Sequence, residues 1–332
     1  MSLRTRSLVL ALAALLLAGA AGGYTLWAAG RRDAATAAGA GPPDAVRGPV
    51  RLGGLMFLAA GAGPDNGHVA GEAGGSRTVA PQTCARFYAA AGTAVCLRAE
   101  RGAVTRYHAR ILDRGLRETR SVELPGVPSR ARVSAAGHLV AWTVFVSGDS
   151  YLTSGMSTRT GLLDTRTGEV VQSLERFALF REGRRVEEAD LNYWGVTFAR
   201  DEDTFYASAS TGGVVHLVRG SVSAGRMEVL RENAECPSLS PDGTRVVYKK
   251  RTGDAAGPWR LHVLELGTGG ERPLAETGNV DDQAAWLDSG TVMYAKVRGD
   301  SSDVWAVPAD GTGRPRLLLR DAYSPAAVED DG

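Results

Sequence analysis

The chain has 332 residues with a net charge of +1, and 44% of its residues are hydrophobic and 23% charged. Such a composition is ordinary for a globular protein with a sizeable core. The near balance of 38 basic and 37 acidic residues argues against a nucleic-acid partner, because binding to a phosphate backbone needs a concentrated positive surface.

The N-terminal segment predicts an association with the membrane. Residues 1–6 carry two arginines and would form a cytoplasmic end, and residues 7–29 then run without a charge. A helix of about 20 apolar residues spans a bilayer, which favours a single transmembrane signal anchor at 7–29. The alternative is a cleaved signal peptide, with Ala18 to Ala20 as its cleavage site. Both interpretations place the following residues outside the cytoplasm, either on the cell membrane or secreted.

Residues 30–46 are rich in Ala, Gly and Pro, and Val46 is their only large apolar residue. This composition is typical of a flexible linker between the membrane segment and a folded domain.

The body of the chain repeats one β-unit, in which a turn residue precedes a short run of strand-forming residues. The turn residues are Gly54, Gly92, Gly137, Asp203, Gly243 and Gly290. Four of their five spacings are close to about 40 to 47 residues, the length of a four-stranded propeller blade. The longer spacing between Gly137 and Asp203 predicts an insertion, which we assign to residues 147–157 and 177–191. The mixed charges of this insertion favour a solvated extended hairpin, with a docking loop as the alternative.

The clearest turn is Pro241-Asp242-Gly243. Proline sets the backbone angle of an early turn position, Asp bonds to its own backbone, and Gly adopts a positive φ. A second strand–turn–strand pattern follows at residues 260–274, and similar patterns stand at 161–174 and 303–319. These would form the two outer strands of each blade.

The repeat predicts an all-β fold: a six-bladed β-propeller of four-stranded antiparallel blades at residues 47–328, preceded by one transmembrane helix. A β-sandwich also has many short strands, but it gives no reason for one unit to recur at a near-constant spacing. The predicted blades span about 47–81, 82–126, 127–177, 178–234, 235–275 and 276–320. Residues 321–328 would join the first blade and close the ring, which removes exposed sheet edges; a frayed tail is the alternative.

The segment SLSPDGTRVVYKK at 238–250, followed by RLHVLELGTGGERPL at 260–274, resembles the repeat of TolB-like propellers, also called WD40-like or PD40 repeats. The resemblance is strong at 235–275 and weaker in the other copies. It implies a six-bladed propeller in the extracytoplasmic space, in a membrane-anchored bacterial protein. It says little about chemistry, because one fold serves many functions.

The chain has three cysteines, Cys84, Cys96 and Cys236. A hairpin turn centred near Ala90 would place Cys84 directly opposite Cys96, within the range of a disulfide bond. An oxidising extracytoplasmic space would favour this bond; two buried thiols are the alternative. Cys236 would then be a buried, unpaired strand residue.

Motifs for catalysis or cofactor binding are absent from the sequence. There is no G-x-S-x-G nucleophile motif, no H-E-x-x-H or other paired-histidine metal motif, and no phosphate-binding loop. We therefore expect no enzymatic activity, no cofactor and no bound nucleotide.

The best candidates for function lie where the innermost strands would begin, at the mouth of the central channel. They are Ser129, Arg130, Asn192, Tyr193, Trp194, Glu232, Asn233, Asp281 and Asp282. We expect this rim to bind another protein or a cell-envelope component, with Arg130, Tyr193 and Trp194 as anchors. The alternative is a channel-centred lyase or hydrolase, in one version Ca²⁺-dependent, that uses Asp281 and Asp282. The rim residues would otherwise be ordinary solvated loops.

Overall fold

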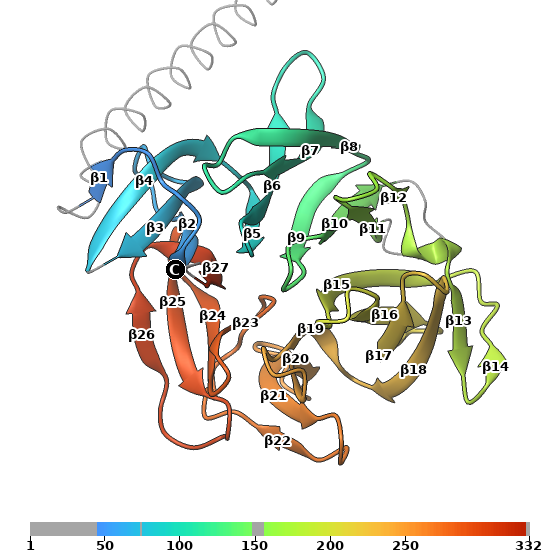
Figure 1. Cartoon of the computed structure of the whole chain (residues 1–332). Helices are drawn as coiled ribbons and strands as arrows, with labels where there is room; N and C mark the ends of the chain where they lie inside the picture. The colour runs from blue at the N-terminus through green and yellow to red at the C-terminus, as the bar shows by residue number, and fades with distance from the viewer. Residues whose placement is uncertain (1–44, 74, 148–155, 330–332) are drawn as a thin grey trace, which may run out of the picture. The chain divides into compact units, whose positions relative to one another are not determined.

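Six β-sheets stand around a common axis in the computed structural model, which describes residues 45–73, 75–147 and 156–329 (Figure 1). All the described strands belong to one compact unit, residues 44–61 and 65–332. The predicted six-bladed propeller is confirmed, and most of its blades are four-stranded and antiparallel.

Four blades have the predicted four strands, with the innermost strand first in sequence order. Blade 2 contains β5 (Arg86–Ala90), β6 (Thr93–Glu100), β7 (Arg106–Leu112) and β8 (Glu118–Leu124); blade 3 contains β9 (Val127–Val133), β10 (Leu139–Ser147), β11 (Met156–Asp164) and β12 (Val170–Val171); blade 5 contains β19 (Glu235–Leu239), β20 (Arg245–Arg251), β21 (Trp259–Glu265) and β22 (Glu271–Pro273); blade 6 contains β23 (Ala285–Asp288), β24 (Thr291–Arg298), β25 (Ser301–Pro308) and β26 (Arg316–Leu319). The turn at Pro241–Gly243 joins β19 to β20. There the Asp242 carboxylate accepts hydrogen bonds from Ser240 and Thr244, and Gly243 has a φ of 72°.

The ring is closed by the last strand of the sequence. In blade 1, β27 (Ala322–Val328) is the inner strand and pairs antiparallel with β2 (Gly54–Ala59), followed outwards by β3 (His68–Ala73) and β4 (Ser76–Thr83). The two ends of the propeller sequence thus share one sheet, which lies between blades 2 and 6 (Figure 1). Strand β27 thereby pairs with the edge of β2 that would otherwise be free.

Blade 1 has a fifth strand that the sequence analysis assigned to the linker. Strand β1 (Ala45–Arg47) pairs in parallel with β4 at the outer edge of the sheet. The prediction that the linker extends to residue 46 is therefore wrong. The reason is that this pairing uses backbone hydrogen bonds at an exposed edge, so it needs no hydrophobic pattern that a sequence would display.

Blade 4 has six strands, which also departs from the predicted four. Its inner strands are β15 (Asn192–Phe198), β16 (Thr204–Thr211), β17 (Val214–Ser221) and β18 (Arg226–Glu232). The inserted hairpin β13 (Ala178–Arg181) and β14 (Arg184–Arg185) adds to the outer edge, with β13 parallel to β18. It follows the short 3-10 helix η1 (Leu174–Arg176).

The second part of the predicted insertion, residues 177–191, contains a hairpin, as expected, but only one side of it is solvated. Most of the first part, residues 147–157, lies outside the described residues. Arg184 and Arg185 are exposed, whereas Leu179 and Val186 are buried in the cluster of apolar side chains between blades 3 and 4. These apolar residues explain why the hairpin adheres to the blade edge.

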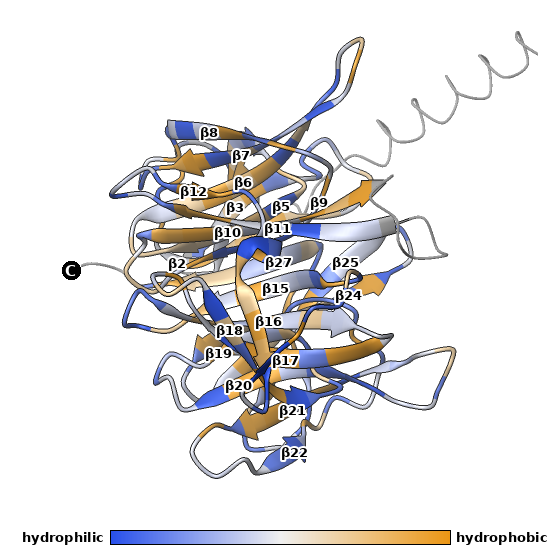
Figure 2. Cartoon of the chain, turned by 90° about the vertical axis from the view of Figure 1, so that its right-hand side faces the viewer, coloured by the Kyte–Doolittle hydropathy of each residue, from blue (hydrophilic) through white to orange (hydrophobic). Residues whose placement is uncertain are grey.

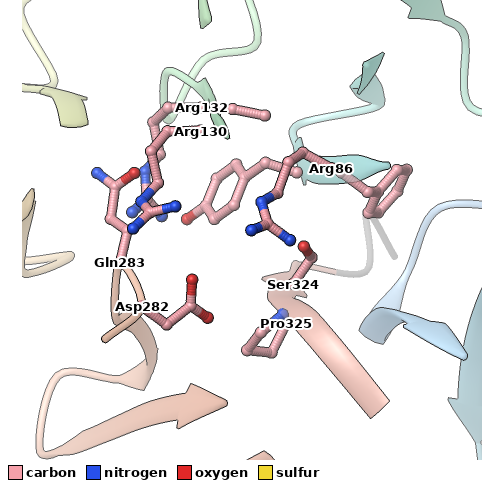
Figure 3. A pocket seen from close by; sticks show the side chains of 10 residues that line it. Arg86, Arg130, Arg132, Asp282, Gln283, Ser324 and Pro325 are labelled. Carbon is pink, nitrogen blue, oxygen red and sulfur yellow. The ribbon is translucent and has the colours of Figure 1, made fainter. Parts of the chain in front are cut away.

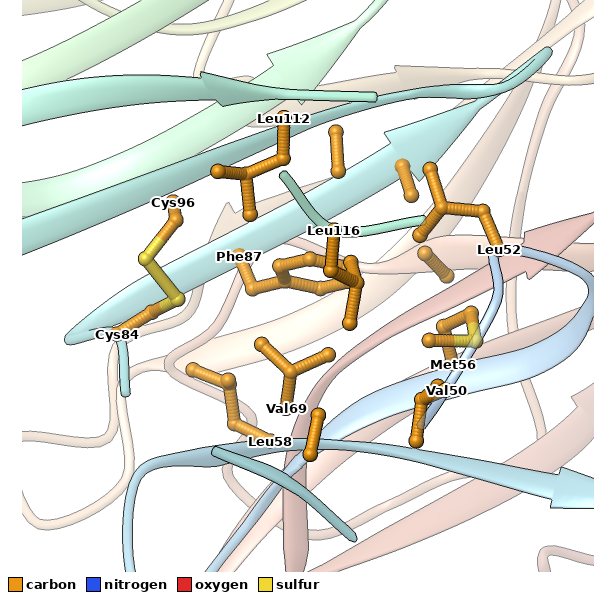
Figure 4. Close-up of a cluster of buried hydrophobic side chains, with 14 of the residues drawn as sticks. Val50, Leu52, Met56, Leu58, Val69, Cys84, Phe87, Cys96, Leu112 and Leu116 are labelled. Atoms are coloured by element: carbon orange, nitrogen blue, oxygen red, sulfur yellow. A yellow bond between two sulfur atoms is a disulfide. The ribbon is translucent and has the colours of Figure 1, made fainter. Parts of the chain in front are cut away.

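Hydrophobic side chains pack between neighbouring blades. Strands of the blades carry many of the hydrophobic residues (Figure 2). Between blades 1 and 2, Leu58 and Val69 pack against Phe87 and Leu112 in one cluster (Figure 4). Burial of such side chains contributes about 1.5–3 kcal/mol each to folding. Contacts between blades therefore stabilise the ring in addition to the hydrogen bonds within each sheet.

Cys84 and Cys96 form a disulfide bond at the edge of this cluster, with their Cα atoms 5.3 Å apart (Figure 4). Their predicted position directly opposite each other is wrong, because the turn lies at Ala91 and Gly92 and Phe87 is the partner of Cys96. Cys84 precedes β5, and the bond joins the connection between blades to β6. Cys236 is unpaired and buried.

We expect the double substitution of Cys84→Ala and Cys96→Ala to lower the free energy of unfolding by about 2–3 kcal/mol. The reason is that the disulfide closes a loop with a sequence separation of 12, and loops of this size contribute roughly 3 kcal/mol by restricting the unfolded chain. Urea titrations would measure the change. A reductant should lower the unfolding midpoint of the natural protein to that of the variant, and should leave the variant unaffected. Equal midpoints without reductant would contradict the prediction.

The predicted transmembrane segment at 7–29 lies outside the described residues. In the part of the protein that the structure describes, η1 is the only helix, and no helix there has the length and apolar character needed to span a bilayer.

Candidate functional site at the channel mouth

The two faces of the ring differ in the segments that they carry. We call the face on which each inner strand begins the mouth face, and the opposite one the turn face. The mouth face carries the connections 252–258 and 274–284, whereas the turn face carries tight turns such as 91–92 and 289–290. Binding residues usually lie on loops that a rigid scaffold positions. We therefore expect the binding residues on the mouth face.

The central channel is bridged by a buried arginine. Arg132 on β9 donates from Nη2 to the backbone oxygen of Ala284, 3.0 Å away, across the ring from blade 3 to blade 6. Its guanidinium also stacks over the ring of Tyr88 on β5, with 4.2 Å from the guanidinium carbon to the ring centre. Only 4% of Arg132 is exposed. A hydrogen bond to a carbonyl and contact with an aromatic face offset part of the cost of burying this charge.

Gln283 closes the channel from another side. Its Nε2 donates to the backbone oxygens of Val196 in blade 4, at 3.1 Å, and Pro237 in blade 5, at 2.8 Å. Gln283 and Arg132 together join five of the blades, 2 to 6, through hydrogen bonds to backbone carbonyls and an aromatic contact. They separate a hollow on the turn face from a pocket on the mouth face, and Arg132 lines both.

The pocket on the mouth face, called the mouth pocket below, is shown in Figure 3. It is lined by Arg86, Phe87, Tyr88, Arg130, Ala131, Arg132, Asp282, Gln283, Ser324 and Pro325. These residues come from β5, β9 and β27 and from the segment before β23. The charged side chains are three arginines and one aspartate, so the lining carries a net positive charge.

Two arginines of the mouth pocket share one acceptor. The backbone oxygen of Ser129 accepts a hydrogen bond from Nε of Arg86 at 2.7 Å and from Nη1 of Arg130 at 2.9 Å. Two positive guanidinium groups are thereby held close together. Burial opposes the charged form of Arg130, but the adjacent Cys236 sulfur and Asp282 carboxylate outweigh it and raise the pKa of Arg130. Arg130 therefore stays charged at any physiological pH.

Beside the pocket lies a lysine–aspartate pair. Lys249 on β20, of which 3% of the side chain is exposed, donates from Nζ to the Asp281 carboxylate at 2.6 Å. Its ammonium group also lies 4.5 Å from the centre of the Trp259 ring. Burial favours the neutral acid, but the Lys249 charge outweighs it and lowers the pKa of Asp281. The Asp281 side chain itself is 61% exposed, so this pair presents a carboxylate to solvent.

Glu235 at the start of β19 is the second carboxyl beside this pair. It is 8% exposed, and burial raises its pKa against the opposing effect of Lys249 and Arg251. The pKa of Glu235 is thus raised and that of Asp281 lowered, and opposite pKa shifts of this kind are typical of acid–base pairs.

The structure brings some of the predicted rim residues to the mouth and not others. Arg130 and Asp282 line the mouth pocket. Asp281 lies beside the pocket, where its carboxylate accepts a hydrogen bond from Lys249. Asn233 lies on this face too, where its amide group caps the end of β20 through hydrogen bonds with the backbone of Arg251.

Tyr193 and Asn192 do not form a binding rim, and this prediction is wrong. Tyr193 is 1% exposed in the apolar cluster between blades 3 and 4, and burial raises the pKa of its hydroxyl. Asn192 accepts a hydrogen bond from the backbone nitrogen of Thr158 and so joins β15 to β11. Trp194 is half-buried, pairs with Ser208 within blade 4 and does not line the mouth pocket.

Sequence analysis missed Arg86, Arg132, Lys249, Glu235 and Gln283. A signal was present for some of them: Arg130 and Arg132 alternate on one inner strand, and charged residues are rare inside strands that are buried on both sides. Across the described ranges, no group of three or more His, Cys, Asp or Glu side chains is arranged to hold a metal ion.

Comparison with solved structures places this architecture among known propellers. TolB from Acinetobacter baumannii superposes with a TM-score of 0.57 and 16% sequence identity, covering 83% of this chain and 67% of that one. The protein has the fold of a TolB-like six-bladed propeller. A putative TolB from Agrobacterium tumefaciens is also similar, with a TM-score of 0.44, 11% identity, and coverage of 83% of this chain and 85% of that one.

An oligogalacturonate lyase in complex with manganese is similar too, with a TM-score of 0.44, 10% identity, and coverage of 73% and 66% of the two chains. No protein-family model matches the sequence. No curated protein matches it either.

Proposed function

We propose that this TolB-like propeller is a binding module, not an enzyme, and that it recognises a protein or a cell-envelope component on its mouth face. The observation that carries the proposal is the bridged channel. Because Arg132 and Gln283 close the axis, the charged pocket of the mouth face ends at these two side chains. Such a surface suits recognition of a partner that approaches from outside the ring.

The charged side chains of the mouth face favour a polar partner with specific geometry. Arg86 and Arg130 present guanidinium groups, and Asp281 and Asp282 present carboxylates, within one small area. Arginine is enriched among the residues that dominate binding energy at protein interfaces. Mixed charges of this kind also fix the orientation of a partner.

We further propose that the propeller lies on the extracytoplasmic side, attached to the cell membrane through residues 7–29 or secreted after their cleavage. The Cys84–Cys96 disulfide supports an oxidising compartment, since such bonds are rare in the cytosol. The apolar segment at 7–29 supports a membrane anchor.

Photo-crosslinking from the two faces of one blade would test the proposed binding face. A photoreactive amino acid replaces Asp254 in the mouth-face connection of blade 5, and in a matched variant it replaces Thr268 in a turn-face loop of the same blade. Both positions are exposed. We expect a discrete crosslinked product in cells of the source organism from position 254 and none from 268. Products from 268 alone, or from neither, would overturn the proposal.

A second candidate function is catalysis at the same mouth, as a lyase or hydrolase. It is favoured by one observation, the opposite pKa displacements of Glu235 and Asp281. Against it, the Asp281 carboxylate is already paired with Lys249. A screen of glycoside and polyuronate substrates should show turnover that disappears in a Glu235→Gln variant if this candidate is correct.

A further inference from the structure

The mouth pocket holds more positive charge than its own residues neutralise. Its three arginines face one carboxylate, that of Asp282 (Figure 3). Arg86 and Arg130 additionally donate to the same carbonyl oxygen of Ser129, so two like charges lie close together. Like charges at close range repel, and an anion between them would remove that repulsion.

Two hydrogen-bond donors of the pocket also lack an acceptor. The Nε atoms of Arg130 and of the 4% exposed Arg132 are buried and donate to no atom of the described residues. Buried donors without an acceptor are costly, by roughly 1–3 kcal/mol each. The pocket is therefore prepared for an acceptor that the protein itself does not provide.

The acceptor that fits best is a carboxylate. A planar guanidinium matches a carboxylate through two parallel hydrogen bonds. Phosphate offers similar oxygens, but it carries nearly two negative charges near neutral pH. Asp282 on the pocket wall would repel a dianion more strongly than a monoanion. The charge balance therefore favours a ligand group with a single negative charge.

We propose that the mouth pocket binds a carboxylate group of the partner, held between Arg86 and Arg130. This inference rests on the proposed binding function and specifies its chemistry. The carboxylate belongs either to an Asp or Glu side chain or to the terminal carboxyl group of a polypeptide, and both sources present the same group. Asp282 disfavours a ligand group with two negative charges and thereby contributes to specificity for a monoanion.

Titration of the full-length protein with small probes, followed by calorimetry or NMR shifts, tests this site. N-acetyl-glutamate α-methylamide carries a carboxylate only on its side chain, N-acetyl-alanine carries only a terminal one, and N-acetyl-alanine amide carries neither. We expect at least one of the two acids to bind in the millimolar range and the amide not to bind. The stronger acid identifies the source of the carboxylate. Inorganic phosphate should bind more weakly than that acid.

Three variants make the test specific. Arg130→Met should weaken binding of the acid at least about 10-fold, because a charge-assisted hydrogen bond is lost. Asp282→Asn should strengthen it several-fold, since the repelling carboxylate is removed and no described residue is hydrogen-bonded to it. Arg120→Met is the control: Arg120 is likewise an arginine that donates to a backbone carbonyl, that of Gly168, but it lies outside the pocket, so binding should not change.

The outcomes separate this inference from the proposed function. No binding of either acid, unchanged binding in Arg130→Met with an unchanged melting temperature, tighter binding of phosphate, or weaker binding in Asp282→Asn would each overturn the carboxylate site. Arg130→Lys keeps the charge but not the planar pair of donors, so it should bind the acid more tightly than Arg130→Met and more weakly than the natural protein, which shows that a loss in Arg130→Met reflects charge and not folding. Crosslinks from the turn face together with carboxylate binding in the pocket would instead overturn the proposed function alone.

Discussion

A protein shortened to end at Arg320 should show no cooperative unfolding transition at 25 °C, whereas one that ends at Glu329 should unfold like the full-length protein. The shorter form lacks β27, the inner strand of blade 1. Domains of this kind are stable by only about 5–15 kcal/mol, and the loss of one complete inner strand removes a comparable amount.

The contacts of β27 explain this large effect. Its residues Ala322, Ala326 and Val328 are buried, and they belong to the clusters of apolar side chains on both sides of blade 1. Without β27, β2 would lose its antiparallel partner and present an unpaired edge. Urea denaturation followed by circular dichroism and by tryptophan fluorescence would measure the loss.

A synthetic peptide of residues 321–329 provides an independent check on ring closure. Added to the protein that ends at Arg320, it should restore the cooperative transition, because it can pair with β2. A shortened protein that unfolds cooperatively within about 2 kcal/mol of the full-length form would show that closure contributes little.

We expect Gly195→Ala to lower the free energy of unfolding by about 3 kcal/mol or more. Gly195 lies in the irregular part of β15 with a φ of +65°, and a Cβ atom there would come within 2.7 Å of the Cα atom of Cys236 in the next blade. A positive φ costs an alanine roughly 1–2 kcal/mol, and overpacking against a backbone that cannot yield adds about 1–3 kcal/mol.

Gly212→Ala is the matched control for this substitution. Gly212 has a similar φ of +57°, but no atom lies within 4 Å of its hypothetical Cβ. The free energy of unfolding of Gly212→Ala should fall only by the cost of a positive φ for alanine, about 1–2 kcal/mol. The difference between the two variants in a denaturant titration measures the close approach of blades 4 and 5. Equal losses would show that these blades can separate at no cost.

Local patterns were enough to predict the propeller. Turns such as Pro241–Gly243 and their spacing depend on backbone geometry that neighbouring residues determine, and the tail at 321–328 displays the pattern of an inner strand. The sequence could not show β1 or the parallel pairing of β13 with β18. Both depend on backbone hydrogen bonds at a sheet edge between segments that lie far apart in the sequence.

The candidate site was predicted only in part, because side-chain direction in the inner strands does not follow simple alternation. Irregularities interrupt β15 between Trp194 and Thr197, and β19 and β27 contain residues with positive φ at Cys236 and Ser324. Each irregularity shifts which side chains point to the mouth and which point between blades. Tyr193 stands near the start of β15, where the repeat predicts a rim residue, but its side chain packs in the core.

The sequence by itself determined the number of blades, and it placed Arg130 in an inner strand and Asp281 and Asp282 shortly before one. Those features follow from short-range turn and strand preferences repeated along the sequence. Only the tertiary structure decided that Arg86 meets Arg130 on one carbonyl and that Arg132 bridges the axis to Ala284. Such contacts join blades on different sides of the ring, and their geometry exists only once the ring has closed.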